Sequence, residues 1–297
     1  MSRLRLSITG TVKIMLVVTA ALALSLAYVL RQMTRLPVNN PQKFRQLGGR
    51  SSLVPGQRIV VCLGASIVHG RVCPNFVDLA ATRLPSSAFA FVNAGVNGDT
   101  SYHVLQRLDR VIACDPDYVI ILVGTNDVIC TLIPEQWRMY RGNKRLPSPP
   151  TIETYSTNLH QIVRRLRHET HSQIAICSLP VLGEDLKAAG NERVRLFNRA
   201  IRQICEAEEA RYLPVYEQEA SYLAERQQSN QVQGVAFKPV EKEILRYSFL
   251  GTIRHYLLQQ SWDKIASSRG MLLKTDTIHG NSIEAEIISG NLITFLG

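Results

Sequence analysis

Two segments of this sequence carry the residue types that nucleophilic catalysis needs. Ser66 lies in VVCLGASIVHG, directly after an apolar run, where a serine on a tight turn can present its hydroxyl as a nucleophile. Asp276 and His279 lie three residues apart in KTDTIHGN. A serine nucleophile needs a base that takes its proton and a carboxylate that orients this base. A D-x-x-H pair can supply both from one loop.

Two further positions are candidates for stabilising the negative charge that develops on a carbonyl oxygen. Gly95 in VNAGVNGDTS has no side chain, so its backbone N–H can approach a ligand closely. Asn126 in ILVGTNDV carries a side-chain amide that can donate a hydrogen bond. Each also has an ordinary alternative role, a simple turn for Gly95 and a helix cap for Asn126. The GxSxG motif of another hydrolase class is not present, because Val68 replaces its second glycine.

The elements that must position these residues follow from the apolar runs. We expect strands at 59–63, 88–93, 118–123, 173–178 and 211–216, and helices at 74–84, 101–113, 154–169 and 192–210. The strands are continuously apolar, which indicates burial on both faces of a parallel sheet. The alternation predicts an α/β fold, a doubly wound, flavodoxin-like three-layer sandwich with a central parallel five-stranded sheet. Ligands of such folds bind at the carboxyl ends of the strands.

In this order, the four segments resemble the SGNH hydrolases, also called GDSL-like lipases and esterases. The matching blocks are Gly64-Ala65-Ser66-Ile67, Asn93-Ala94-Gly95, Gly124-Thr125-Asn126-Asp127 and Asp276-Thr277-Ile278-His279, within a resemblance that runs from about 57 to 290. The resemblance implies a serine esterase that works through an acyl-enzyme, with Ser66, Asp276 and His279 as catalytic residues. It also implies an oxyanion hole formed by the backbone N–H groups of Ser66 and Gly95 and the side-chain amide of Asn126. No metal or organic cofactor is expected.

One position departs from the family's pattern. The first block usually reads GDS, and Ala65 stands where the acid is expected. Ala65 is not the nucleophile, so loss of activity does not follow, but a polar group that helps to fix the turn is missing. The expected substrate is a small ester in a lipid or an acylated glycan, contacted by loops such as 128–150. The alternatives are acyl transfer or thioester hydrolysis at the same site, and a non-catalytic binding module on a degenerate SGNH fold.

Composition argues against other classes of protein. The 297 residues are 45% hydrophobic and 20% charged, which is typical of a globular chain. The net charge is +10, but the basic residues are spread out and accompany no zinc-finger or aromatic-interleaved pattern, so no nucleic-acid partner is expected. The six cysteines form no CxxC pair, which favours reduced, buried thiols over a metal site.

The N-terminal segment predicts a membrane anchor. Residues 14–30 form an uncharged apolar run at the short end of what spans a bilayer as a helix. The alternative is a signal peptide cleaved near Ser25-Leu26-Ala27, which would give a secreted protein. We favour an uncleaved single-pass anchor because the apolar run continues beyond that site. More basic residues follow the run than precede it, which favours a cytoplasmic domain, whereas tethered members of the family are expected to face outward. The side of the membrane stays open.

These observations divide the chain into three parts. Residues 1–31 are an N-terminal cytoplasm–membrane segment with a transmembrane helix at about 14–30, residues 32–57 are a polar linker, and residues 58–297 are the SGNH hydrolase domain. Within that domain, about 217–270 interrupts the strand–helix alternation and is expected to be a helical insertion. Ordinary packed helices are the simple interpretation of this insertion, and a membrane-lying lid is the alternative.

Overall fold

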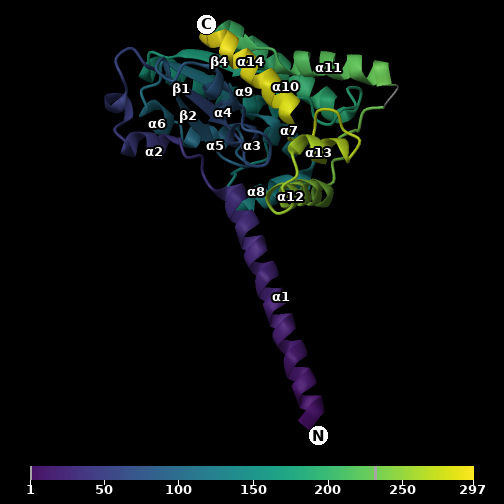
Figure 1. The fold of residues 1–297 in the computed structure, drawn as a ribbon. Coiled ribbons are helices and arrows are strands. Elements are labelled where there is room, and N and C mark those ends of the chain that lie inside the picture. The colour runs from purple at the N-terminus through teal and green to yellow at the C-terminus, as the bar shows by residue number, and fades with distance from the viewer. Residues whose placement is uncertain (1, 231–232) are drawn as a thin grey trace.

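A long helix, α1 (Ser2–Thr34), stands away from a domain that contains the strands (Figure 1). The computed structural model describes residues 2–230 and 233–297, so residues 1 and 231–232, parts of the predicted anchor segment and insertion, lie outside the described residues. The strands are β1 (Arg58–Gly64), β2 (Phe89–Gly95), β3 (Tyr118–Leu122), β4 (Gln173–Cys177) and β5 (Arg211–Leu213).

Helices lie before, between and after the strands. In chain order they are α2 (Pro41–Gln46), the 3-10 helix η1 (Gly49–Ser52), α3 (Ser66–His69), α4 (Phe76–Arg83), α5 (Ser101–Gln106), α6 (Asp109–Ile112), α7 (Thr125–Leu132), α8 (Pro134–Asn143), α9 (Ile152–Glu169), α10 (Ala189–Ala207), α11 (Val215–Asn230), α12 (Glu241–Tyr256), α13 (Trp262–Ser267) and α14 (Ser282–Leu296).

The sheet is parallel and has the order β2-β1-β3-β4-β5, which confirms the predicted doubly wound fold. Successive residues of β1 point into opposite layers, because side chains alternate along a strand. Val61 packs in a cluster with Phe197 of α10, while Cys62 packs in a second cluster with Phe76 of α4 and Leu292 of α14. Helices therefore cover both faces of the sheet, and the apolar runs of the strands are buried from both sides.

Three stretches differ from the expectation. The single helix expected at 101–113 is divided into α5 (Ser101–Gln106) and α6 (Asp109–Ile112). The last strand was expected at 211–216, but β5 ends at Leu213, because Pro214 cannot donate to a sheet ladder and α11 begins at Val215. Residues 128–150 were expected as a loop, but they contain the end of α7 and all of α8. Pro134 starts α8, a position where its missing N–H does no harm.

The chain after α1 lies against the edge of the sheet. The backbone N–H of Asn93 in β2 donates to the carbonyl of Asn39 (3.0 Å), and the Asn39 side chain donates to Phe91 O (3.1 Å). Because β2 is an edge strand, these bonds satisfy groups that would otherwise face solvent. Val29 near the end of α1 is fully buried. The residues between α1 and β1, expected as a linker, therefore carry α2 and η1 and are tied to the domain.

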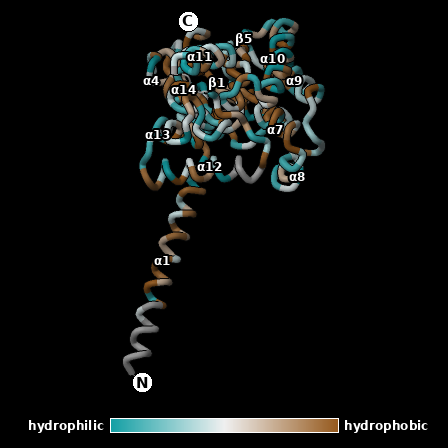
Figure 2. Tube along the Cα trace, turned by 90° about the vertical axis from the view of Figure 1, so that its right-hand side faces the viewer, coloured by the Kyte–Doolittle hydropathy of each residue, from teal (hydrophilic) through white to brown (hydrophobic). Residues whose placement is uncertain are grey.

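Only 6% of the apolar stretch of α1 is buried by the rest of the described chain. One helical segment, Val12–Thr34, is long and apolar enough to cross a membrane by length and composition. Figure 2 shows apolar residues along the part of α1 that lies outside the domain.

The close packing of β1 depends on a glycine, which gives a prediction. A Cβ on Gly64 would lie 2.1 Å from the carbonyl oxygen of Leu122 in β3 and 2.5 Å from a methyl group of Val68. We expect Gly64→Ala to lower the free energy of unfolding by at least about 2 kcal/mol. Gly142→Ala in α8 is the matched control, because no described atom outside its two chain neighbours and its own helix backbone lies within 4 Å of the added methyl. Urea unfolding compares the two, and a Gly64→Ala variant as stable as wild type would contradict the packing.

Candidate active site

The carboxyl edge of the sheet gathers three of the four predicted segments. Ser66 begins α3 just beyond β1, Gly95 is the last residue of β2, and Asn126 lies in the first turn of α7 after β3. The fourth segment, which we call the catalytic loop, comprises residues 272–281 between α13 and α14. This loop returns to the same edge and brings His279 to Ser66, 213 residues apart in sequence.

A continuous row of hydrogen bonds joins the serine to the acid. Ser66 Oγ lies 2.8 Å from His279 Nε2, and His279 Nδ1 lies 2.8 Å from Asp276 Oδ2. Burial alone would raise the pKa of Asp276, but the imidazole of His279, its backbone N–H and a serine hydroxyl together lower that pKa to about 2. An ionised Asp276 can only accept, so His279 Nδ1 carries the proton and Nε2 is free to accept from the serine hydroxyl.

The D-x-x-H segment forms a tight turn around its own carboxylate. Asp276 Oδ1 accepts from the backbone N–H groups of Ile278 (3.1 Å) and His279 (2.7 Å). Thr277 has φ of +72°, a region that side-chain-bearing residues rarely adopt. One carboxylate oxygen thus holds the backbone of the loop while the other holds the imidazole.

The backbone N–H groups of Ser66 and Gly95, both predicted oxyanion donors, differ in their hydrogen-bond partners. Ser66 is the first residue of α3, so its N–H has no partner within that helix. The Gly95 N–H donates to the side-chain oxygen of Asn93 (2.9 Å). A Cβ on Gly95 would lie 2.2 Å from the backbone nitrogen of His69, so this glycine lets the end of β2 approach α3. The structure therefore explains the glycine by packing, and its amide already has a partner.

The amide of Asn126 is held in a fixed orientation. Its Nδ2 donates to Asp99 O (2.9 Å), and its Oδ1 accepts from the hydroxyl of Tyr140 in α8 (3.1 Å). An amide group has two hydrogens, so one bond to Asp99 leaves the second for a ligand. The Asp99 carboxylate is itself buried and paired with Arg107 (2.7 Å) and Lys144 (2.6 Å). These contacts fix the loop after β2 against α7 and α8.

Comparison with known protein families assigns the chain to a family. The sequence profile of the GDSL-like lipase/acylhydrolase family matches residues 62–233, more than half of the chain. The chain belongs to this family. It is a hydrolase that acts on ester bonds, as the family resemblance of the sequence had indicated. No curated protein matches the chain.

Solved structures share the fold of this family member at low sequence identity. An acetylxylan esterase from Geobacillus stearothermophilus is 16% identical with a TM-score of 0.55, over 82% of this chain and 95% of that one. A second acetyl xylan esterase is 14% identical with a TM-score of 0.56, over 80% of this chain and 100% of that one. A hydrolase from the metagenome of Lake Arreo, Spain, is 17% identical with a TM-score of 0.53, over 80% and 94%. These likenesses confirm the fold.

Ser248 of α12 also contacts the carboxylate of Asp276. The sequence analysis did not identify this residue. Its hydroxyl donates to Asp276 Oδ2, the oxygen that also accepts from the imidazole, and lies 3.4 Å from His279 Nδ1. Ser248 lies 28 residues before Asp276, in a stretch without a recognisable motif. No signal in a single sequence would have identified it, because only the packing of α12 over the catalytic loop brings it there.

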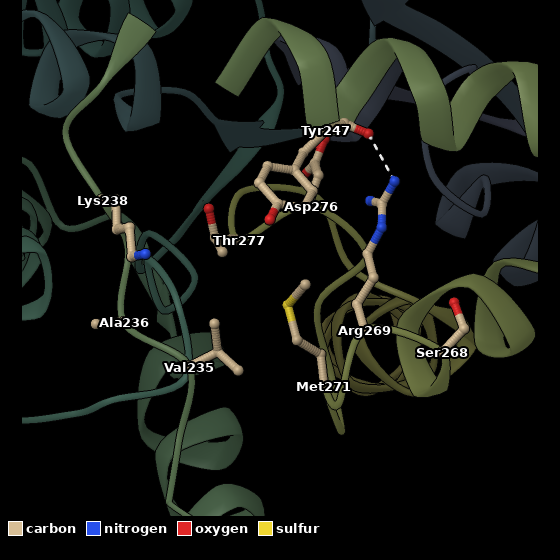
Figure 3. A pocket seen from close by; sticks show the side chains of 9 residues that line it. All are labelled: Val235, Ala236, Lys238, Tyr247, Ser268, Arg269, Met271, Asp276 and Thr277. Carbon is tan, nitrogen blue, oxygen red and sulfur yellow. Dashed lines mark hydrogen bonds between the residues drawn. The ribbon is translucent and has the colours of Figure 1, made fainter. Parts of the chain in front are cut away.

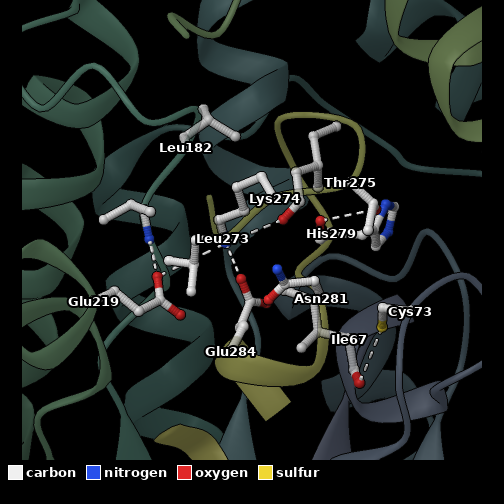
Figure 4. A network of polar contacts seen from close by, with 12 residues as sticks. Ile67, Cys73, Leu182, Glu219, Leu273, Lys274, Thr275, His279, Asn281 and Glu284 are labelled. Atoms are coloured by element: carbon white, nitrogen blue, oxygen red, sulfur yellow. Dashed lines mark hydrogen bonds and ion pairs between the residues drawn. The ribbon is translucent and has the colours of Figure 1, made fainter. Parts of the chain in front are cut away.

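A buried charge network supports the catalytic loop (Figure 4). The Glu184 carboxylate accepts from the backbone N–H groups of Leu272, Leu273 and Lys274. The Lys274 ammonium is fully buried, bonds to Glu284 and lies 3.7 Å from Glu219. Burial alone would lower the pKa of Lys274, but the surrounding carboxylates have the larger combined effect and raise this pKa above its usual value. The amine therefore stays charged. The loop is thus fixed by ionic contacts as well as by hydrogen bonds to its backbone.

A cavity of about 330 Å³ reaches the site from the side of the acid (Figure 3). Its lining includes Asp276 and Thr277 of the catalytic loop, Tyr247 of α12, and Arg269, whose guanidinium donates to Tyr247 O (3.0 Å). Ser66 and His279 are not part of this lining. The cavity therefore borders the base-orienting carboxylate rather than the nucleophile.

The position of Ser248 yields a second prediction. Loss of its hydroxyl removes one bond to a buried carboxylate, worth about 1.5–3 kcal/mol. We expect Ser248→Ala to lower kcat by about tenfold or more with little change in KM, because Ser248 acts through Asp276 and does not contact substrate. Ser248→Thr, which keeps a hydroxyl, should recover much of the rate.

Steady-state kinetics on a soluble ester measures this effect. Ser156→Ala in α9 is the matched control, since that hydroxyl bonds only to a backbone carbonyl of its own helix among the described residues. Equal kcat in Ser248→Ala and Ser156→Ala would contradict a positioning role.

Proposed function

We propose that this chain is a serine esterase that hydrolyses carboxylic esters with Ser66 as nucleophile, His279 as base and Asp276 as the acid that orients it. The observation that carries the proposal is the hydrogen-bonded row from Ser66 Oγ through both imidazole nitrogens to Asp276. In the acetylxylan esterase from Geobacillus stearothermophilus, alanine variants of one serine and one histidine are described as catalytic mutants, which agrees with this assignment.

The geometry supports the following steps. His279 Nε2 takes the proton of Ser66 as Oγ attacks the ester carbonyl, and the ionised Asp276 stabilises the imidazolium that forms. The imidazolium then gives its proton to the leaving alcohol oxygen, which leaves an acyl group on Ser66. Water, deprotonated by the same imidazole, attacks the acyl-enzyme. The imidazolium then returns this proton to Ser66 Oγ as the bond to the acyl group breaks and the carboxylic acid leaves. The chain of proton transfers starts and ends with the same protonation state of His279.

The predicted oxyanion donors stabilise the negative charge that develops on the carbonyl oxygen of the ester. The Ser66 N–H at the start of α3 and the second amide hydrogen of Asn126 are the donors with the fewest competing bonds. The Gly95 N–H would contribute only by releasing the side chain of Asn93. One such donor is typically worth about 3 kcal/mol in the transition state.

The substrate class proposed is a small ester of an acylated glycan or of a lipid. Two structural neighbours named as acetyl xylan esterases support the acyl-glycan member of this class. We further propose that α1 is an uncleaved single-pass anchor. Leu22 and Leu24 are 66% and 72% exposed in the structure, all residues from 12 to 24 are exposed, and a run of apolar side chains so exposed is stable in lipid rather than in water.

Turnover and active-site labelling test the proposed function. Ser66→Ala should lose p-nitrophenyl acetate hydrolysis by about 10⁴-fold or more and should not react with a fluorophosphonate probe. Ser86→Ala, at an exposed serine outside the site, should behave as wild type. A folded wild type that neither turns over esters nor takes the label would contradict the proposal and favour a binding module.

A further inference from the structure

The end of α1 is fixed to the edge of the sheet that carries the catalytic residues. Asn97, two residues beyond Gly95, donates from its side chain to the carbonyl of Met33 in the last turn of α1 (2.7 Å). Val29, one turn earlier, is fully buried in the domain. The apolar run of α1 therefore ends at the carboxyl edge of the sheet, with no free tether between anchor and site.

Helix α12 packs beside the end of α1 on the same side of the domain (Figures 1 and 2). The hydroxyl of Tyr256, the last residue of α12, donates to the carbonyl of Arg71 just after α3 (2.9 Å). Ser248, two turns earlier, bonds to Asp276. One face of α12 thus contacts both the segment that follows the nucleophile and the acid of the triad.

The opposite face of α12 is apolar and exposed. Thr252 is fully buried against the domain, whereas Leu250 and Leu257 are exposed, and Leu258 in the following turn is 61% exposed. Exposed leucines at this density beside an apolar helix indicate a contact outside the chain. Continuity with α1 indicates that this contact is lipid.

The charges around this face are mostly positive. The first turn of α12 contains Glu241, Lys242 and Glu243, whereas the segment 246–260, which carries the exposed leucines, contains Arg246 and Arg254 and no Asp or Glu. Helix α8 lies at the same end of the domain and adds the exposed Arg138 and Arg141, against the single acid Glu135 (Figure 1). A basic rim beside an apolar stripe fits the headgroups of an anionic bilayer.

We propose that the apolar face formed by Leu250 of α12 and by Leu257 and Leu258 just after it docks on an anionic lipid surface beside α1, and that the site acts on esters carried by membrane-borne amphiphiles. This proposal rests on the proposed membrane anchor. The carboxyl edge of the sheet then faces the headgroup layer. The acyl group of a lipid or of a lipid-linked glycan reaches Ser66 without leaving the membrane surface.

Fluorophore positions relative to lipid test the docking. All six cysteines of the chain are buried, so a cysteine introduced at the surface can be labelled selectively. The full chain, labelled in turn at Leu22→Cys, Leu258→Cys and Thr294→Cys, is reconstituted in vesicles of phosphatidylcholine and phosphatidylglycerol that contain spin-labelled lipid quenchers. Thr294 is exposed on α14, at the end of the domain remote from α1 (Figure 1).

Lipid quenching is expected at positions 22 and 258 and not at 294. Quenching at 22 with none at 258 would overturn the docking and leave the anchor intact, whereas none at either position would also contradict the anchor. Quenching at 258 should weaken in vesicles of phosphatidylcholine alone. Equal quenching in both vesicle types would overturn the assignment to an anionic surface.

The preference for membrane-embedded over soluble esters tests the proposal that the site acts on membrane-borne substrates. We measure the turnover of a long-chain ester embedded in the vesicles divided by that of a soluble short-chain ester. Leu250→Glu should lower this ratio by about tenfold, because it removes apolar contact and adds charge repulsion. Leu196→Glu on α10, with a similar exposed fraction (36% against 41%), is the matched control and should keep the ratio. An unchanged ratio in Leu250→Glu would overturn the delivery of substrate from the membrane. A wild type that hydrolyses neither ester would contradict the proposed esterase function.

Discussion

The contact between the buried carboxylate of Asp276 and the imidazole of His279 is the interaction on which the site depends. An ionised carboxylate inside a protein costs several kcal/mol unless it is paired and hydrogen-bonded. Asp276 meets this requirement with bonds from two backbone N–H groups, the imidazole and Ser248. These bonds keep its pKa at about 2, and they set the tautomer in which His279 accepts from Ser66. Each structural feature around the catalytic loop can be understood as holding this pair in place.

Two layers of charge provide that support. At the catalytic loop, the Glu184 carboxylate accepts from three backbone N–H groups, and the Lys274 ammonium pairs with Glu219 and Glu284. At the sheet edge, Asp99 with Arg107 and Lys144 fixes the loop whose carbonyl orients Asn126. Removing one member of such a buried pair typically costs 3–5 kcal/mol, about as much as a small domain can lose. The parallel sheet brings the three strand ends together, and the buried ions hold the loops that the sheet itself does not constrain.

The sequence allowed the sheet and the family to be predicted because both depend on local patterns. Continuous apolar runs identify strands buried on both faces, and the blocks around Ser66, Asn126 and His279 each lie at a strand end or in one short loop. Ser248 and Lys274 could not be predicted in the same way, since their roles come from contacts between segments that are remote in sequence. Gly95 shows a further difference. Its type suggested an amide open to ligand, whereas the structure requires a glycine there because β2 approaches the backbone of α3 within the reach of a methyl group.

The central claim is that Ser66, His279 and Asp276 act as one unit. The most direct test is kcat for p-nitrophenyl acetate in Ser66→Ala, Asp276→Asn and the double variant, with folding checked by thermal unfolding. Residues that act as a unit give strongly non-additive losses. The account predicts a large loss in each single variant and no further loss when Asp276→Asn is added to Ser66→Ala, since no serine proton is left to transfer. Losses that multiply in the double variant would contradict it, because they would show that Asp276 serves catalysis independently of the nucleophile.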